Sequence, residues 1–135
     1  MGMTHCASVQ DRLYNHRNTG KTDETMNPTL AQSLKRICPN NTIAQISIPL
    51  NSNTKHIYLV DNSFYKQILA GKGILQIDQD MALDPRTNKF VKELAEDNKA
   101  FLDKFSKAMV KMGAIEVLTG NQGEIRRSCR AFNES

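Results

Sequence analysis

Two helix starts, each marked by an amide or carboxylate side chain followed by proline, constrain the fold of this chain more than any other feature. Asn27 precedes Pro28, and Asp84 precedes Pro85. The first side chain of each pair can accept hydrogen bonds from the free N–H groups of a helix start, and proline suits the first helical position. Each predicted helix carries apolar residues on one face, namely Leu30, Leu34 and Ile37 in the first and Phe90, Val91 and Leu94 in the second.

Two further segments have marked ends. One begins at residue 61 or 62 and stops at Gly71, and the other is capped by Asp97 and stops at Gly113. The opening residues 1–14 predict one more helix, already in progress at the start of the sequence. Helices therefore account for most of the regular structure that the sequence predicts.

The segments 15–25 and 40–60 differ from the rest because they are polar or rich in β-branched residues and poorly periodic. Only short strands are expected there, around residues 46–48 and 57–60. The sequence predicts one domain of the mainly α class, with at most short β-strands.

Composition excludes several classes of function. The chain has 135 residues, 39% of them hydrophobic, which suffices for one ordinary core. The net charge of +4 comes from scattered basic residues, apart from a cluster of Arg126, Arg127 and Arg130. No nucleic-acid-binding signature is present, no apolar run approaches the length of a membrane span, and the first residues do not resemble a secretory signal.

The three cysteines leave several pairings open. Cys6 and Cys38 could form a disulfide or remain two buried thiols. The glycosylation sequon of Asn40, Asn41 and Thr42 favours a secreted protein, and hence a disulfide. The third cysteine, Cys129, could be a free thiol, form an intermolecular bridge, or pair with a residue outside this sequence.

Residues that could carry chemistry are few. Asn51, Ser52, Asn53, Thr54 and Asp61 form an oxygen-rich cluster that suits Ca²⁺, or equally a polar loop before a helix. A second candidate is Asp78, whose apolar neighbours suggest either a paired carboxylate near the interior or a helix cap. The histidines His5, His16 and His56 have no metal-ligand spacing. The residues alone show no complete active site.

Several runs together resemble the plant secretory, class III, haem peroxidase family. They are DRLYN (11–15), NPT and CP within 27–39, LAGKGILQIDQ (69–79), DPRT (84–87) and AMVKMGAIEVLTGNQGEIRRSCRAFN (108–133). These runs follow the order and spacing of the family over essentially the whole chain, and the last of them is long and specific.

The resemblance implies that residues 1–135 are the C-terminal, proximal half of the helical haem-peroxidase fold, without the N-terminal distal half. The family's iron-ligating histidine matches a position two residues before Met1, and the distal histidine and arginine match positions further upstream. We therefore expect these 135 residues to be inactive as an isolated chain, with binding of haem b or calcium in doubt.

The family's functional residues carry over individually. Asp78 matches the aspartate that accepts a hydrogen bond from the proximal histidine, and Gly2, Met3, His5 and Leu50 match positions beside the haem. For calcium, Asp61 matches an aspartate ligand, while Leu59 would offer a carbonyl and Thr54 a threonine oxygen. Asn51 stands where the family has another aspartate, in a loop about two residues longer, so calcium affinity should be reduced.

The same resemblance implies a local Cys6–Cys38 bridge and leaves Cys129, whose family partner lies in the other half, unpaired. It implies hydrogen peroxide as substrate, phenolic donors oxidised by single electrons, a role in peroxide removal under oxidative stress, and an extracellular or vacuolar location. The alternative is a non-catalytic remnant, a small secreted protein that binds cell-wall polyanions through its basic C-terminal arginines.

Overall fold

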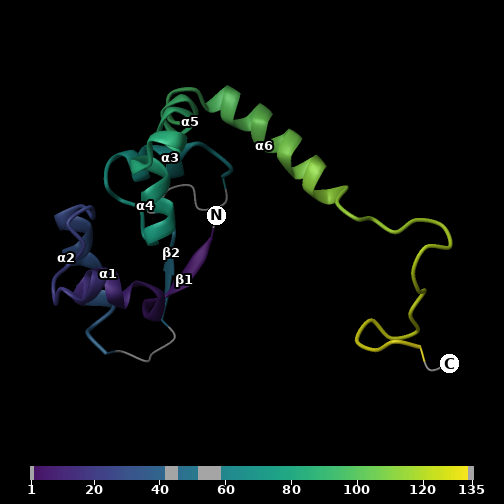
Figure 1. Cartoon of the computed structure of the whole chain (residues 1–135), viewed down its shortest axis with the longest axis horizontal. Coiled ribbons are helices and arrows are strands. Elements are labelled where there is room, and N and C mark those ends of the chain that lie inside the picture. The colour runs from purple at the N-terminus through teal and green to yellow at the C-terminus, as the bar shows by residue number, and fades with distance from the viewer. Residues whose placement is uncertain (1, 42–45, 52–58, 134–135) are drawn as a thin grey trace. The chain divides into compact units, whose positions relative to one another are not determined.

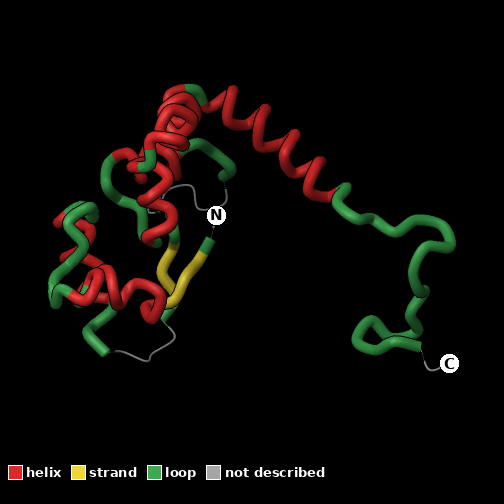
Figure 2. The backbone as a smooth tube through the Cα atoms, viewed as in Figure 1, coloured by secondary structure: helices red, strands yellow, loops and turns green. Residues whose placement is uncertain are grey.

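A computed structural model describes residues 2–41, 46–51 and 59–133. The chain divides into two compact units, Met1–Leu102 and Asp103–Ser135, which are treated separately below. Six α-helices, two short 3₁₀ helices and one two-stranded sheet are present in the described ranges (Figures 1 and 2). The prediction of a mainly α fold is confirmed.

The start of the chain forms a strand, which the sequence did not predict. Strand β1 (Met3–His5) is followed by the 3₁₀ helix η1 (Cys6–Val9) and the short helix α1 (Gln10–Tyr14). Strand β1 pairs antiparallel with β2 (Ser47–Pro49), so that Thr4 lies opposite Ile48. The prediction of a single helix over residues 1–14 is wrong because residues 3–5 find a hydrogen-bonding partner more than forty positions away.

Strand β2 confirms the expectation around residues 46–48. The second expected strand, 57–60, falls partly outside the described residues, and its last two residues, Leu59 and Val60, are not in a strand. A second 3₁₀ helix, η2 (His16–Asn18), lies in the polar segment after α1.

Helix α2 (Pro28–Ile37) begins where the sequence predicts. The Asn27 side chain accepts hydrogen bonds from the backbone N–H groups of Thr29 at 3.1 Å and Leu30 at 3.2 Å. These bonds satisfy two of the donors that a helix start leaves without partners.

A first core joins α1, α2, η1 and β2 in the lower left part of Figure 1. The Cys6–Cys38 disulfide lies inside it, and both cysteines are fully buried. Its buried residues are Cys6, Val9, Leu13, Met26, Ala31, Leu34, Cys38, Ile48 and Ile74. Leu50 and Leu75 are half-buried and pack against this core from its edge.

A second core lies between α3 (Ser63–Leu69), α4 (Gln76–Leu83) and α5 (Pro85–Glu96). Ile68, Ala82 and Val91 are its buried residues, one from each helix. The buried Asn62 side chain donates to the carbonyls of Leu94 and Ala95, both at 2.9 Å, and so ties the start of α3 to the end of α5.

Helix α6 (Asn98–Gly113) starts at the predicted cap, because Asp97 accepts from the N–H groups of Lys99 and Ala100. In the first unit, Phe101 is buried, with its ring centroid 5.6 Å from that of Tyr65. No helix within the described residues is both long enough and apolar enough to cross a membrane.

The second unit contains the rest of α6 and a chain of turns. Asn133 closes a loop within it by accepting from the Arg127 N–H and donating to the Ile125 carbonyl, each at 3.0 Å. Cys129 lies on this loop, is exposed, and carries a free thiol.

Candidate functional site

Asp78 occupies the third position of α4, and one of its carboxylate oxygens is the central feature of the candidate site. Its Oδ2 is buried and has no hydrogen-bond partner in the part of the chain that the structure describes. Burial raises the pKa of Asp78, against the opposing effects of the Arg12 charge and a backbone hydrogen bond at Leu75. An acceptor buried without a donor is costly, so this oxygen is suited to a donor that the described residues do not provide.

The turn that leads into α4 is held by a buried arginine. Arg12 lies on α1 and is only 2% exposed. Its Nη1 donates to the carbonyls of Gly73 at 2.7 Å and Ile74 at 3.0 Å, just before the helix that carries Asp78. The guanidinium thus connects the first helix to the candidate site.

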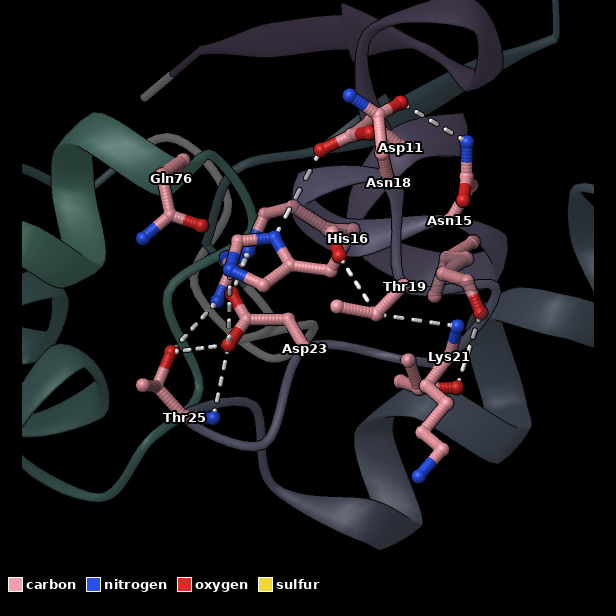
Figure 3. Close-up of polar contacts among 12 residues, drawn as sticks. Asp11, Asn15, His16, Asn18, Thr19, Lys21, Asp23, Thr25 and Gln76 are labelled. Carbon is pink, nitrogen blue, oxygen red and sulfur yellow. Dashed lines mark hydrogen bonds and ion pairs between the residues drawn. The ribbon is translucent and has the colours of Figure 1, made fainter.

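Asp23 pairs with this arginine and is itself fully engaged. Arg12 Nε donates to Asp23 Oδ2 at 2.7 Å. Asp23 Oδ1 accepts from the Thr25 N–H and hydroxyl at 2.8 and 2.7 Å (Figure 3). Burial acts to raise the pKa of Asp23, but the bonds from Thr25 and Arg12 outweigh it, and the pKa is lowered. Asp23 is therefore a stable anionic partner for Arg12.

The four residues expected beside haem lie at the small sheet. Met3 and His5 belong to β1 and are exposed, and the Gly2 carbonyl accepts from the Leu50 N–H at 2.9 Å. A Cβ on Gly2 would come within 3.0 Å of Leu50 Cδ1, so a larger side chain would displace that leucine. These four residues form one group beside the first core.

Two of the expected calcium ligands, Asn51 and Asp61, lie close together at the start of α3. Ser63 links two of them, since its hydroxyl accepts from Asn51 Nδ2 at 2.7 Å and donates to Asp61 Oδ1. The Asn51 amide oxygen accepts from Gln67, Leu59 is exposed, and Thr54 lies outside the described residues. No cluster of three metal-binding His, Cys, Asp or Glu side chains occurs within the described ranges. Among the described residues Asn51 and Asp61 thus bond neighbouring side chains, and their role as calcium ligands stays a prediction.

The expected local bridge is present. Cys6 and Cys38 form a disulfide that spans 32 positions of the sequence. The third cysteine, Cys129, is exposed and forms no disulfide within the described residues. The bridge fixes the start of η1 against the end of α2.

His16 lies in a polar cluster that the sequence did not mark as a site. Its Nδ1 is 3.6 Å from Asp11 Oδ2, and its Nε2 is 3.8 Å from Asp23 Oδ1 (Figure 3). Both separations exceed hydrogen-bonding distance, and Nδ1 is buried without a hydrogen-bond partner among the described residues. Gln76 approaches the same cluster from α4, beside a cavity of about 500 Å³.

Comparison with known proteins identifies the family. The sequence profile of the family described as "Peroxidase" matches residues 1–97. The chain is also 43% identical over 135 residues to Peroxidase 57 of Arabidopsis thaliana and 44% identical over 136 residues to Peroxidase 28 of the same plant. The chain belongs to the peroxidase family.

The match to these peroxidases covers nearly all of this chain but less than half of theirs. It spans 98% of this chain and 41% of both Peroxidase 57 and Peroxidase 28. A third relative, Peroxidase 60 of Arabidopsis thaliana, is 42% identical over 132 residues and is covered to 40%. The resemblance to plant peroxidases is confirmed at the level of the family.

Arg12 is the buried residue beside the candidate site that analysis of single residues missed. It belongs to the DRLYN run, which supported the family resemblance without assigning this arginine a role. Arginine is rarely buried unless paired, and its partners come from residues 23, 25, 73 and 74. Only the folded peroxidase chain brings these groups together.

Proposed function

We propose that residues 1–135 form the proximal part of a haem peroxidase that reduces hydrogen peroxide and oxidises phenolic donors by single electrons. The observation that carries this proposal is the buried Asp78 Oδ2, which has no hydrogen-bond partner among the described residues. Membership of the peroxidase family supports it independently.

The chain's residues would act on haem from one side. Bound haem supplies the iron at which hydrogen peroxide is reduced. Asp78 would accept the Nδ1–H of the histidine that ligates the iron, which would orient the imidazole and increase its basicity. Gly2, Met3, His5 and Leu50 form the neighbouring wall. Residues 1–135 offer no match to that histidine, nor to the distal histidine and arginine, so sequence outside this range would supply all three.

Two observations bear on the location and on the alternative function. The buried Cys6–Cys38 disulfide favours an oxidising compartment, which agrees with an extracellular or vacuolar protein. A polyanion-binding remnant has less support. Arg126, one of the three arginines of the cluster, pairs with Glu124 at 3.3 Å and stacks on the Phe132 ring, so its charge is partly compensated.

A chimera tests the proposal. The part of Arabidopsis Peroxidase 57 that precedes the matched region is fused to residues 1–135, and haem absorption and oxidation of a phenol by hydrogen peroxide are measured. We expect the chimera to bind haem and turn over, and the isolated 135-residue chain to do neither. Loss of a partner that orients a metal ligand typically costs about tenfold to a hundredfold in activity, which we expect for Asp78→Asn.

The matched control is Asp80→Asn, which changes an exposed carboxylate on the same helix that accepts from Gln76 at 2.7 Å. It should leave turnover unchanged. A folded chimera that binds no haem, or equal activity in the Asp78 and Asp80 variants, would overturn the proposed function.

A further inference from the structure

The position of Asp78 depends on a short turn, because α4 begins only two residues before it. The turn consists of Gly73, Ile74 and Leu75, and the first two of these residues are buried. The carbonyls of Gly73 and Ile74 both accept from Arg12 Nη1. If the turn shifted, the first turn of α4 and the Asp78 carboxylate would shift with it.

Arg12 is itself fixed on the side away from this turn. Its Nε donates to Asp23 at 2.7 Å, and its Nη2 lies 3.4 Å from the Thr25 hydroxyl. A planar guanidinium can hold a carboxylate and two carbonyls at once, whereas a lysine ammonium lacks that fork of donors. Through the hydrogen bonds of this arginine, a shift of α1 or of the loop at residues 23–25 would also shift the start of α4.

Gln79 holds the same turn from the opposite side. Its Oε1 accepts from the Gly73 N–H at 3.1 Å, and its Nε2 donates to the Ile68 carbonyl at 2.8 Å. A Cβ on Gly73 would come within 3.0 Å of the Gln79 backbone nitrogen and of its side-chain oxygen. Arg12 and Gln79 therefore both hold Gly73, the arginine at its carbonyl and the glutamine at its N–H.

Charge links the same residues. Arg12 carries a buried positive charge that favours the ionised form of Asp78. Asp23 lies against the same guanidinium and carries a compensating negative charge. Because Asp23 bonds the guanidinium, its negative charge lies where it would oppose the effect of Arg12 on Asp78.

We propose that Arg12 is a positioning residue for Asp78, which holds the turn that places this carboxylate, and that Asp23 limits how strongly the arginine's charge stabilises it. The link to catalysis rests on the proposed function, but the physical coupling of the three residues does not.

The coupling is tested on the full chain without haem. Asp78 is titrated by NMR through its side-chain carboxyl carbon. Arg12→Gln removes the positive charge and should raise the pKa of Asp78, whereas Asp23→Asn removes the compensating charge and should lower it. Asn62→Ala is the control, because it removes a buried polar side chain that bonds α5 instead of the turn. Shifts in the same direction in both charge variants, or shifts no larger than in the control, would overturn the proposal.

Two further measurements keep the test decisive. If Arg12→Gln does not fold, the comparison of Asp23→Asn with Asn62→Ala decides, because only the former should lower the pKa of Asp78. Arg12→Lys retains the charge but loses the fork, so we expect about tenfold faster hydrogen exchange at the Gln79 N–H, in the first turn of α4, and no change in α5. Unchanged exchange at Gln79 would contradict the positioning role. A chimera that fails to bind haem would overturn the proposed function but leave these readouts intact.

Discussion

Opening the Cys6–Cys38 disulfide should lower the free energy of unfolding by about 3.7 kcal/mol. The bond closes a loop of 32 residues. In the chain-entropy relation, a loop of that length reduces the entropy of the unfolded chain by about 12.4 cal/mol/K, or about 3.7 kcal/mol at about 25 °C. Small domains are stable by only about 5–15 kcal/mol, so the bond contributes a large share.

Reduction is a cleaner perturbation than substitution. Both cysteines are fully buried in the first core, and replacing them with alanine would add the cost of a cavity. Reduction leaves the sulfur atoms in place. The comparison should use a Cys129→Ser background, since this exposed free thiol could exchange with the disulfide.

Urea unfolding of the oxidised and reduced chains, followed by circular dichroism, measures the difference. The midpoint should fall on reduction, and the extrapolated free energies should differ by about 3.7 kcal/mol. A difference below about 1 kcal/mol would refute the reasoning, because the loop would then contribute little of the entropy that the chain-entropy relation assigns to it.

Three further predictions concern stability and are checked by the same unfolding assay. Asn27→Ala removes the cap of α2 and should cost about 1 kcal/mol, whereas Asn27→Asp should restore most of it. Asn62→Ala leaves two carbonyls without their donor and should cost about 2 kcal/mol; no loss would show that water replaces the side chain. Because the pKa of Asp23 is lowered in the folded chain, its contribution is complete above the unfolded pKa of about 3.9 and is lost as the pH falls through the lower folded value. Asp23→Asn should remove this part of the pH dependence of stability. If stability fell at acidic pH as much in Asp23→Asn as in the parent chain, the loss could not be assigned to Asp23.

Features with local causes were predictable from the sequence. The starts of α2, α5 and α6 follow from Asn27, Asp84 and Asp97, whose side chains bond N–H groups two or three residues away. Strand β1 was not predictable in this way, because its partner lies more than forty residues away and no pattern within residues 3–5 marks it.

Helix α4 was not predicted from the sequence, because two of its apolar residues are exposed and one of its polar residues is buried. Ile77 is 71% exposed and Leu83 is 53% exposed, while the polar Gln79 is only 2% exposed. Gln79 is buried because it bonds the turn before the helix and the carbonyl of Ile68. Apolar periodicity does not reveal a helix whose buried residues are an amide, Gln79, and a small alanine, Ala82.

The candidate site was predictable only in part. Asp78 could be singled out from its apolar neighbours and from the family resemblance. The part played by Arg12 depends on contacts more than sixty positions apart in the sequence, which only the fold provides.

The most direct test of the account is the iron–imidazole stretching frequency of the ferrous chimera, measured by resonance Raman spectroscopy. A hydrogen bond from the imidazole to a carboxylate strengthens the imidazole as a ligand, so the frequency should fall in Asp78→Asn and stay unchanged in Asp80→Asn. An equal frequency in the parent chimera and in the Asp78 variant would show that this carboxylate does not accept the ligand's N–H, and would contradict the account.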